Sequence, residues 1–262
     1  MTDTPGEPFP VHTVATWRRL LAEFLGTALL VTAVVGSGIM ATTLSPGDVG
    51  LQLLQNSVAT AFALGALILT FGPVSGAHFN PVVSAADWFL GRRTGTGLTA
   101  GQVGGYLAAQ TLGAIAGAVL ANLMFGLTAV DLSTKDRAAG HLWLGEVVAT
   151  TGLLLLIFAL ARSGRAATAP AAVGAYIGAA YWFTSSTSFA NPAVTIGRAF
   201  TDTFAGIAPA SVPAFVAAQL AGLVIGVGLV LALYPDAGRA ADQIVVPGDA
   251  PAENSARQAA NR

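Results

Sequence analysis

The chain has 262 residues, of which 54% are hydrophobic and 10% are charged, and its formal net charge at pH 7 is −1. Soluble domains carry about a quarter charged residues, so this composition indicates a membrane protein, and the lack of a basic block argues against nucleic-acid binding. Cysteine is absent, which excludes disulfides, zinc–thiolate centres and thiol chemistry. We expect no cofactor and no metal site, and no nucleophile–base pair stands out that would indicate an enzyme.

Six apolar stretches are long enough to cross a bilayer, for which about 20 residues are needed. In chain order they cover residues 20–44, 51–72, 98–125, 142–161, 169–187 and 212–234. The first is too long for the apolar region of a signal peptide, so we interpret it as a retained helix. Two further apolar segments, 80–90 and 191–200, are too short to cross. The pattern predicts an all-α membrane protein with six transmembrane helices and two short helices.

Basic residues near the ends of the spans predict the orientation, because cytoplasmic loops carry an excess of Arg and Lys. Three segments on one side carry arginine pairs, namely Arg18 and Arg19, Arg92 and Arg93, and Arg162 and Arg165. On the other side, Lys135 and Arg137 are accompanied by Asp131 and Asp136. We therefore expect both termini in the cytoplasm and the protein in the inner (plasma) membrane.

Three regions follow from this pattern. Residues 1–14 form an N-terminal cytoplasmic tail, and residues 15–234 form the membrane domain, with repeats at about 15–130 and 139–234. Residues 235–262 are polar and rich in Pro and Ala, and we expect them to be a disordered cytoplasmic tail.

The two halves of the membrane domain resemble each other. Asn80-Pro81-Val82 in the first half matches Asn191-Pro192-Ala193 in the second, an offset of 191 − 80 = 111. Glu23 lies in the first span of its half, and Glu146 in the first span of the other. Because each half holds three spans, an odd number, the halves enter the membrane from opposite sides. The sequence predicts an inverted repeat.

The Asn-Pro pairs predict where the two short helices begin. Asn is a favoured N-cap, and Pro is favoured at the first helical position. Irregular backbone at membrane depth is tolerated only where protein or water covers it, so the two helix starts are expected to meet near the midplane. Their positive dipole ends and the free NH₂ groups of Asn80 and Asn191 would then form a polar, cation-repelling point on a path across the membrane.

These features resemble the major intrinsic protein family, the aquaporins and aquaglyceroporins. The residues that carry the resemblance are AEFLGT at 22–27, SGAHFNPVVS at 75–84, GEVVATTG at 145–152 and SFANPAVT at 188–195. The resemblance implies an aquaporin-like fold, a passive channel in the lipid bilayer, and a homotetramer with one pore per subunit. Val82 departs from the Ala that is usual at its position, which would alter how the two short helices meet.

The buried ionisable residues have two interpretations each. In the first interpretation, Glu23 and Glu146 are proton relays of a coupled transporter. In the second, which the resemblance implies, their carboxylates accept hydrogen bonds from the backbone of the re-entrant loops. We favour the structural role, because a desolvated carboxylate needs such donors. His78 is a pH gate or, as is more common, a side chain that packs within its loop.

The narrowest part of the pore is where the sequence departs from most of the family. The resemblance places an arginine directly after the second Asn-Pro-Ala, but Val194 stands there. Spacing from the two Asn residues places Thr60, Ala179 and Ser188 at the other three positions of the selectivity filter, with Gly178 replacing Ala179 if the loop is one residue longer. This set has no aromatic ring and no charge, so it predicts a wide, neutral constriction that favours uncharged solutes larger than water.

Val in place of the filter arginine resembles the bacterial aquaglyceroporins associated with arsenic resistance. The implied solutes are glycerol, urea-like molecules, arsenite and other metalloid hydroxides, and methylated arsenicals. Two alternatives stay open, a coupled secondary transporter that uses Glu23 and Glu146, and a structural membrane protein with little transport.

Arg198 is the first basic residue after the second Asn-Pro pair. It lies four residues beyond Val194 and so shares its helix face, about 6 Å further out at ~1.5 Å per residue. We expect it in the extracellular vestibule, where it repels cations and orients polar solutes; the alternative is that it only ends the helix. Asp87, at the matching position in the first half, is expected to give the cytoplasmic mouth the opposite charge.

Overall fold

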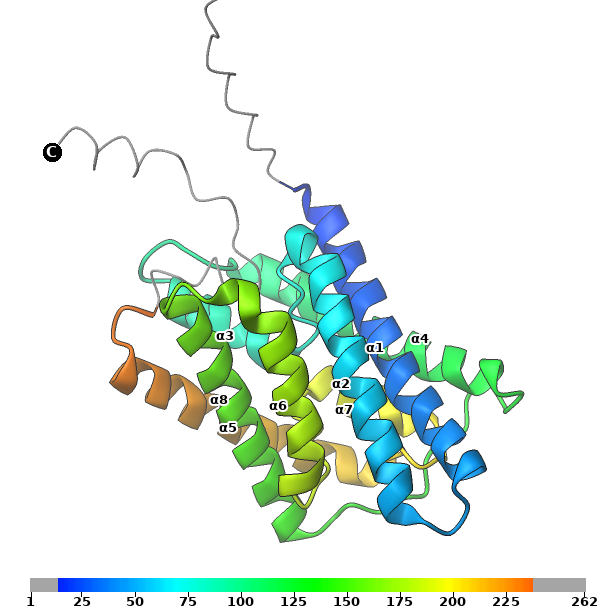
Figure 1. The fold of residues 1–262 in the computed structure, drawn as a ribbon. Coiled ribbons are helices and arrows are strands. Elements are labelled where there is room, and N and C mark those ends of the chain that lie inside the picture. Colours follow the sequence, from blue (N-terminus) through cyan, green and yellow to red (C-terminus); the bar gives the residue numbers. More distant parts are fainter. Residues whose placement is uncertain (1–13, 238–262) are drawn as a thin grey trace, which may run out of the picture.

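The computed structural model describes residues 14–237, and these residues form a bundle of α-helices (Figure 1). The eight α-helices are α1 Thr16–Leu44, α2 Val49–Ser75, α3 Pro81–Gly91, α4 Ala100–Met124, α5 Gly140–Arg162, α6 Ala169–Phe183, α7 Pro192–Gly197 and α8 Val212–Leu233. Three 3₁₀ turns, η1 Ala166–Thr168, η2 Arg198–Phe200 and η3 Pro209–Ser211, connect them. The predicted all-α fold, with six longer helices and two short ones, is confirmed. Apart from residue 14 and residues 235–237, the two expected tails lie outside the described residues. The disorder expected of the C-terminal tail therefore stays a prediction.

Five helical segments in the described part of the chain are long and apolar enough to cross a membrane: Thr16–Leu44, Val49–Ser75, Ala100–Met124, Gly140–Arg162 and Pro209–Leu233. The fifth predicted span, 169–187, corresponds to α6, which has 15 residues and ends at Phe183 rather than continuing to residue 187. It ends early because the following segment turns back toward the bundle, where Thr187, Ser188 and Ala190 have positive φ angles. Large apolar side chains such as Phe62 (76% exposed) and Val224 (73% exposed) point outward, as expected for a surface that faces lipid.

The two halves pack in the same way. Helix α1 packs against α4 in the first half, and α5 packs against α8 in the second. Glycines bring each pair close together: a Cβ atom at Gly117 would lie 2.2 Å from the backbone oxygen of Ala28, and one at Gly222 would lie 2.8 Å from the backbone oxygen of Val147. Small residues at helix crossings permit this approach in membrane bundles. The inverted repeat therefore appears as two matching helix pairs.

The short helices α3 and α7 lie inside the bundle. Helix α3 contacts α4, α5 and α8, and α7 contacts α1, α4 and α8 (Figure 1). The side-chain oxygen of Asn80 accepts a hydrogen bond from the backbone N–H of Val82, and that of Asn191 accepts from Ala193 and Val194. Both helices thus begin at the predicted Asn-Pro pairs, with Asn as the N-cap and Pro in the first turn.

Candidate functional site

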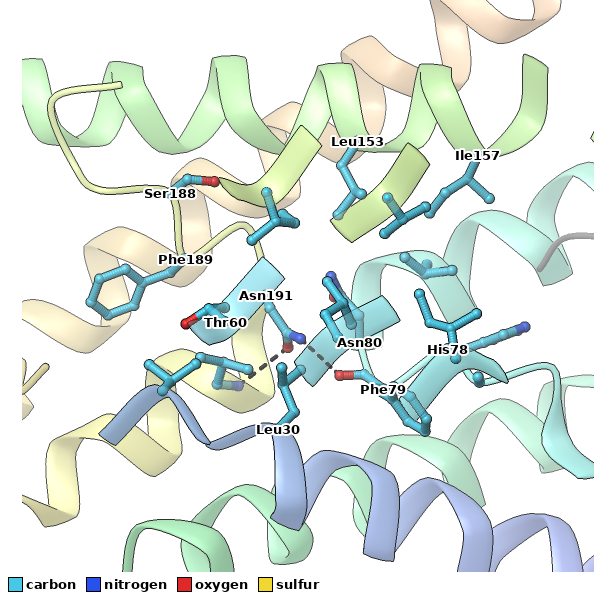
Figure 2. A pocket seen from close by; sticks show the side chains of 18 of the residues that line it. Leu30, Thr60, His78, Phe79, Asn80, Leu153, Ile157, Ser188, Phe189 and Asn191 are labelled. Atoms are coloured by element: carbon cyan, nitrogen blue, oxygen red, sulfur yellow. Dashed lines mark hydrogen bonds between the residues drawn. The ribbon is translucent and has the colours of Figure 1, made fainter. Parts of the chain in front are cut away.

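The two helix starts meet and bond to each other. The Nδ2 atom of Asn80 donates to the carbonyl oxygen of Ala190 at 2.8 Å. In the other direction, Nδ2 of Asn191 donates to the carbonyl oxygen of Phe79 at 2.7 Å (Figure 2). An amide group has two N–H bonds, so each Asn keeps one for a passing molecule. The expectation of a free NH₂ group is corrected in this respect: half of its donor capacity ties one repeat to the other.

Glu23 organises the loop before α3. One carboxylate oxygen accepts hydrogen bonds from Ser75 Oγ at 2.6 Å and from the His78 N–H at 3.0 Å. The other accepts from the Phe79 N–H and from Gln110 Nε2, both at 2.7 Å. The side chain has no exposed surface and does not line the central cavity described below. These contacts correspond to the structural role.

Glu146 does the same in the second half. It accepts from the N–H groups of Phe189 at 2.9 Å and Ala190 at 2.8 Å, and from Gln219 Nε2 at 2.6 Å. Gln219 also donates to Thr195 Oγ1 at 2.8 Å. Gln110 makes the equivalent bond to Ser84 in the first half. Each repeat therefore holds its re-entrant loop with a buried Glu–Gln pair.

The held loops contain backbone in an unfavourable conformation. Ala77 and Phe79 have φ angles of 49° and 50°, and Ser188 and Ala190 both have 48°. Non-glycine residues in the left-handed region cost about 1–3 kcal/mol each. Since the glutamates bind amides in these same loops, they stabilise a shape that the residues would not adopt alone.

A cavity runs along both Asn residues (Figure 2). Its volume, counted as the space that the centre of a water molecule can reach, is about 60 Å³, which leaves room for small molecules. Apolar side chains from four helices form most of its wall: Leu30 and Val34, Leu64 and Ile68, Leu153 and Ile157, and Val173 and Ile177. An apolar wall with a few fixed polar groups suits the passage of small molecules rather than tight binding.

The predicted constriction residues lie partly on this cavity. Thr60, Ser188 and Val194 line it. Ala179 does not: it lies on the exposed face of α6, and Tyr181 reaches the cavity instead, where its hydroxyl lies 3.1 Å from Thr60 Oγ1. Two residues turn a helix by about 200°, so only one member of this pair can face inward. The placement of Ala179 at the constriction is wrong.

Gly178, the alternative to Ala179 at this position, does not line the cavity either. A Cβ atom there would meet the side chain of Ala61 at 3.0 Å. The residue lies in the contact between α6 and α2, in a groove on the outer surface. It serves helix packing.

Arg198 lies deeper than expected. It is 2% exposed, lines the same cavity as Val194, and its guanidinium carbon lies 3.4 Å from the centroid of the Phe189 ring. Its Nε atom donates to the carbonyl oxygen of Ala205. The helix ends at Gly197 and tightens into η2, so the side chain folds back rather than extending outward. With Arg198 and Tyr181 on its wall, the cavity has both a charge and an aromatic ring, which the four residues predicted for the selectivity filter did not include.

A second arginine was missed. Arg137, in the segment between α4 and α5, is 8% exposed. Its Nε donates to the Gly206 carbonyl at 3.0 Å, and its guanidinium carbon lies 4.9 Å from the Phe189 ring centroid. The sequence indicated only that Arg137 lies in an outer loop. Its contact with Phe189 could not be predicted, because it depends on the path of a segment without regular structure.

The remaining predicted residues lie as follows. Asp87 is 2% exposed, accepts from the Leu98 N–H at 2.6 Å and does not line the cavity, so its assignment to the cytoplasmic mouth is corrected. His78 lines the cavity, with Nδ1 3.1 Å from Ser84 Oγ. Val82 is fully buried and packs away from the cavity.

Comparisons with known proteins identify the family of this chain. Residues 10–188 match the family model for major intrinsic protein, a match that includes the first Asn-Pro pair and ends before the second. The chain is 51% identical to aquaglyceroporin AqpS of Rhizobium meliloti over 212 residues, covering 81% of this chain and 88% of that protein. It is 33% identical to the probable aquaporin NIP7-1 of Arabidopsis thaliana over 144 residues, covering 55% of this chain and 50% of that protein.

The fold is also that of a solved structure. The aquaglyceroporin from Plasmodium falciparum aligns with a TM-score of 0.64 at 20% sequence identity, over 86% of this chain and 100% of that one. That likeness concerns the fold alone. The match to the family model and the relative at 51% identity establish that this multi-pass membrane protein belongs to the major intrinsic protein family, whose members are channels rather than enzymes.

Proposed function

We propose that the protein is a passive, aquaglyceroporin-type channel for small neutral solutes, and that glycerol, urea and trivalent metalloid hydroxides are among them. Arsenous acid and methylated arsenicals belong to this class. The observation that carries the proposal is the cavity that passes both Asn residues and has Val194 on its wall where most of the family has arginine. Arsenous acid is neutral at pH 7 and presents hydroxyl groups like a small polyol, so the same polar points serve both.

The size limit of this channel depends on more residues than Val194. Tyr181 and Arg198 line the same cavity, so we expect a pore that selects polar neutral solutes rather than one that is merely wide. The relative at 51% identity carries the name aquaglyceroporin, which supports the same class of solute.

The coupled-transporter alternative is disfavoured by the glutamates. Both carboxylates are fully buried, and all four oxygens accept hydrogen bonds from loop amides or glutamine side chains. A proton relay must exchange partners along a path, whereas these groups are occupied and stand outside the cavity.

Solute flux into liposomes tests the proposal. Purified protein would be reconstituted without any ion gradient, and shrinking and swelling would be followed for water, glycerol, urea, arsenite and methylarsonite. Val194→Trp, which fills the cavity with a large side chain, serves as the matched control. We expect glycerol and arsenite fluxes well above the lipid background for the native protein and near background for Val194→Trp. If the native protein gives no solute flux above the lipid background, a structural membrane protein with little transport is indicated. If solute flux requires a proton gradient, a coupled transporter is indicated.

The assembly and orientation belong to the same proposal. We propose a homotetramer with one pore per subunit in the plasma membrane, with both termini cytoplasmic and residues 15–234 as the channel domain, formed by repeats at about 15–130 and 139–234. Mass measurement in a mild detergent tests the first point, and a monodisperse monomer would contradict it. Protease access to tags at either end of the chain in inside-out and right-side-out vesicles tests the orientation.

A further inference from the structure

A pair of polar rings marks one end of the cavity. His78 lines the cavity, and its ring lies edge-on to that of Tyr106, with the ring centroids 5.4 Å apart. Tyr106 also contacts Arg19, which lies in the first turn of α1. The rings therefore stand at the end of the bundle where α1 begins, on the proposed cytoplasmic side. Figure 2 shows His78 away from Ser188, on the other side of the two Asn residues.

The second half contains the same pair of rings without the polar atoms. Phe189 stands at the position of His78, at an offset of 189 − 78 = 111. Phe215 stands at the position of Tyr106, since each precedes the buried glutamine of its half by four residues. The two Phe rings also meet edge-on, with their centroids 5.2 Å apart. Because two Phe side chains pack in the same way, packing alone does not explain the His and the Tyr of the first half.

The Tyr106 hydroxyl joins Arg19 to the re-entrant loop. It accepts a hydrogen bond from Arg19 Nε at 2.9 Å and donates one to the carbonyl oxygen of Ser75 at 2.8 Å. The guanidinium carbon of Arg19 lies 5.5 Å from the centroid of the Tyr106 ring, which His78 contacts edge-on. Arg19 forms no ion pair with the residues that the structure describes. A positive charge without a carboxylate partner therefore lies one aromatic ring away from His78.

The hydrogen bonds of the His78 ring leave one of its nitrogens accessible. Nδ1 lies 3.1 Å from Ser84 Oγ, which donates to the carbonyl oxygen of Asn80 and accepts from Gln110 Nε2. A hydroxyl has one hydrogen, so with that hydrogen directed to Asn80 the Ser84 oxygen accepts from Nδ1–H. A neutral imidazole with its hydrogen on Nδ1 carries its lone pair on Nε2. Nε2 has no partner among the described residues and is not one of their buried polar atoms.

We propose that Arg19 is a positioning residue for transport: acting through Tyr106, it keeps His78 neutral, and Nε2 then accepts a hydrogen bond from a hydroxyl group of the passing solute. The inference deepens the proposed channel function and rests on it. A solute hydroxyl is both a donor and an acceptor. Asn80 and Asn191 offer it N–H donors further along the cavity, and neutral His78 offers an acceptor near the inner mouth. A protonated imidazole has N–H groups on both nitrogens and no acceptor.

The charges around His78 favour its neutral form. The ionisable groups that face it are Arg19 and Glu23 from α1 and Tyr106 from α4, whereas α2 and α8 carry no ionisable side chain. Glu23 already accepts four hydrogen bonds, so its negative charge is held by those donors. Asp87, on α3, binds the segment before α4. Protonation would place a second positive charge beside the unpaired charge of Arg19, and a like charge disfavours the charged form.

Two variants break the link, and a double variant removes the group that titrates. Arg19→Gln removes the charge, and Tyr106→Phe removes the hydroxyl and keeps the ring. Arg19→Gln combined with His78→Gln leaves no imidazole to protonate. Arg18→Gln is the matched control, because Arg18 is exposed and lies over Trp17 instead. The readout is the ratio of glycerol flux at pH 8 to that at pH 5, in liposomes with the same pH inside and outside. Glycerol does not ionise in this range.

The expected ratio differs between the variants. The native protein and Arg18→Gln give a ratio of about one, since the imidazole stays neutral over this range. In Arg19→Gln the imidazole titrates near the usual histidine pKa of about 6.5, and the ratio rises roughly threefold to tenfold, the loss of about one hydrogen bond. Tyr106→Phe gives a smaller rise, because the charge remains but is no longer bonded to the ring. The double variant returns the ratio to about one.

The protonation state of His78 is also measured directly, from the ¹⁵N chemical shifts of its imidazole in the detergent-solubilised protein, assigned by comparison with His78→Gln. We expect a neutral ring down to pH 5 in the native protein and a titration in Arg19→Gln. This measurement needs no transport. Native glycerol flux at the lipid background would overturn the proposed function together with the solute contact, whereas the ¹⁵N shifts would still decide whether Arg19 controls His78.

Three results would overturn the inference while leaving the channel function intact. A native ratio well above one would show that His78 is a pH gate. A ring that stays neutral in both Arg19→Gln and Tyr106→Phe would show that burial alone keeps it so. A ring that titrates in Arg19→Gln without any change in glycerol flux would exclude the solute contact. Tyr106→Phe keeps the test decisive if Arg19→Gln fails to fold, because the second half packs with Phe at the same position.

Discussion

Replacing Glu146 by Gln removes the charge that holds the second re-entrant loop and preserves the size of the side chain. The carboxylate accepts three hydrogen bonds, at 2.9, 2.8 and 2.6 Å. A Gln side chain offers one oxygen, so it satisfies the N–H of either Phe189 or Ala190, and its NH₂ group then faces another donor. Hydrogen bonds to a charged group contribute about 1.5–3 kcal/mol each, and a buried donor left unpaired costs a further 1–3 kcal/mol.

The expected loss is therefore about 3–5 kcal/mol in the free energy of unfolding. At ~2–4 °C per kcal/mol for a chain of this size, the midpoint of thermal unfolding falls by roughly 10 °C. The strained conformations of Ser188 and Ala190, which the carboxylate stabilises, relax at the same time, so glycerol flux is lost in parallel with stability. Asp131→Asn, which removes an exposed carboxylate, is the matched control and shifts neither quantity.

The assay is thermal unfolding of the detergent-solubilised protein, followed by flux in liposomes. A double variant with Gln219→Leu adds a check, because residues in one hydrogen-bond network show non-additive effects. An unchanged melting midpoint combined with lost transport would refute the reasoning, since a proton relay rather than a structural anchor behaves in that way.

Three further predictions follow from the same geometry. Val194→Arg places a second guanidinium on the cavity wall, so permeability to methylated arsenicals falls more than permeability to water in the liposome assay; equal loss for both would contradict the role of this position in size selection. Gly117→Ala places a Cβ atom 2.2 Å from the Ala28 backbone oxygen and lowers stability by about 1–3 kcal/mol, whereas Gly104→Ala on the same helix meets nothing within 4 Å and leaves the melting midpoint unchanged or raised. Asn191→Ala removes a helix cap and one bond between the repeats, at a combined cost of about 2–4 kcal/mol by thermal unfolding; a stability equal to that of the native protein would show that the repeats associate without it.

Local chemistry made the half-helices predictable. Asn80-Pro81 and Asn191-Pro192 contain the cap and the first-turn residue in adjacent positions, so the helix start is encoded within two residues. The glutamates were recognisable because a charge inside an apolar span requires a partner. Their glutamine partners were not, since Gln110 and Gln219 lie 87 and 73 residues from the carboxylates that they bind.

The constriction was predicted less well because it depends on helix rotation and on loop paths. Thr60, Ser188 and Val194 line the cavity, whereas on α6 the lining residue is Tyr181 and not Ala179, which lies two positions earlier. The position of Arg198 on the helix was estimated from straight α-helical geometry, which the 3₁₀ turn at η2 changes. Arg137 reaches Phe189 from a segment without helix or strand, for which no periodic signal exists.

The hydrogen bonds between the repeats join residues that are synthesised at different times. Asn80 and Ala190 are 110 residues apart, and Asn191 and Phe79 are 112 apart. At a translation rate of about 5–20 residues per second, the first re-entrant loop waits roughly 5–20 s for its partner. Glu23, which binds the amides of this loop, belongs to the same half, whereas the donor for the carbonyl oxygen of Phe79 is Asn191, which is synthesised later. A nascent chain that stalls between the halves is therefore left with an unsatisfied acceptor at membrane depth, and the second repeat completes the first.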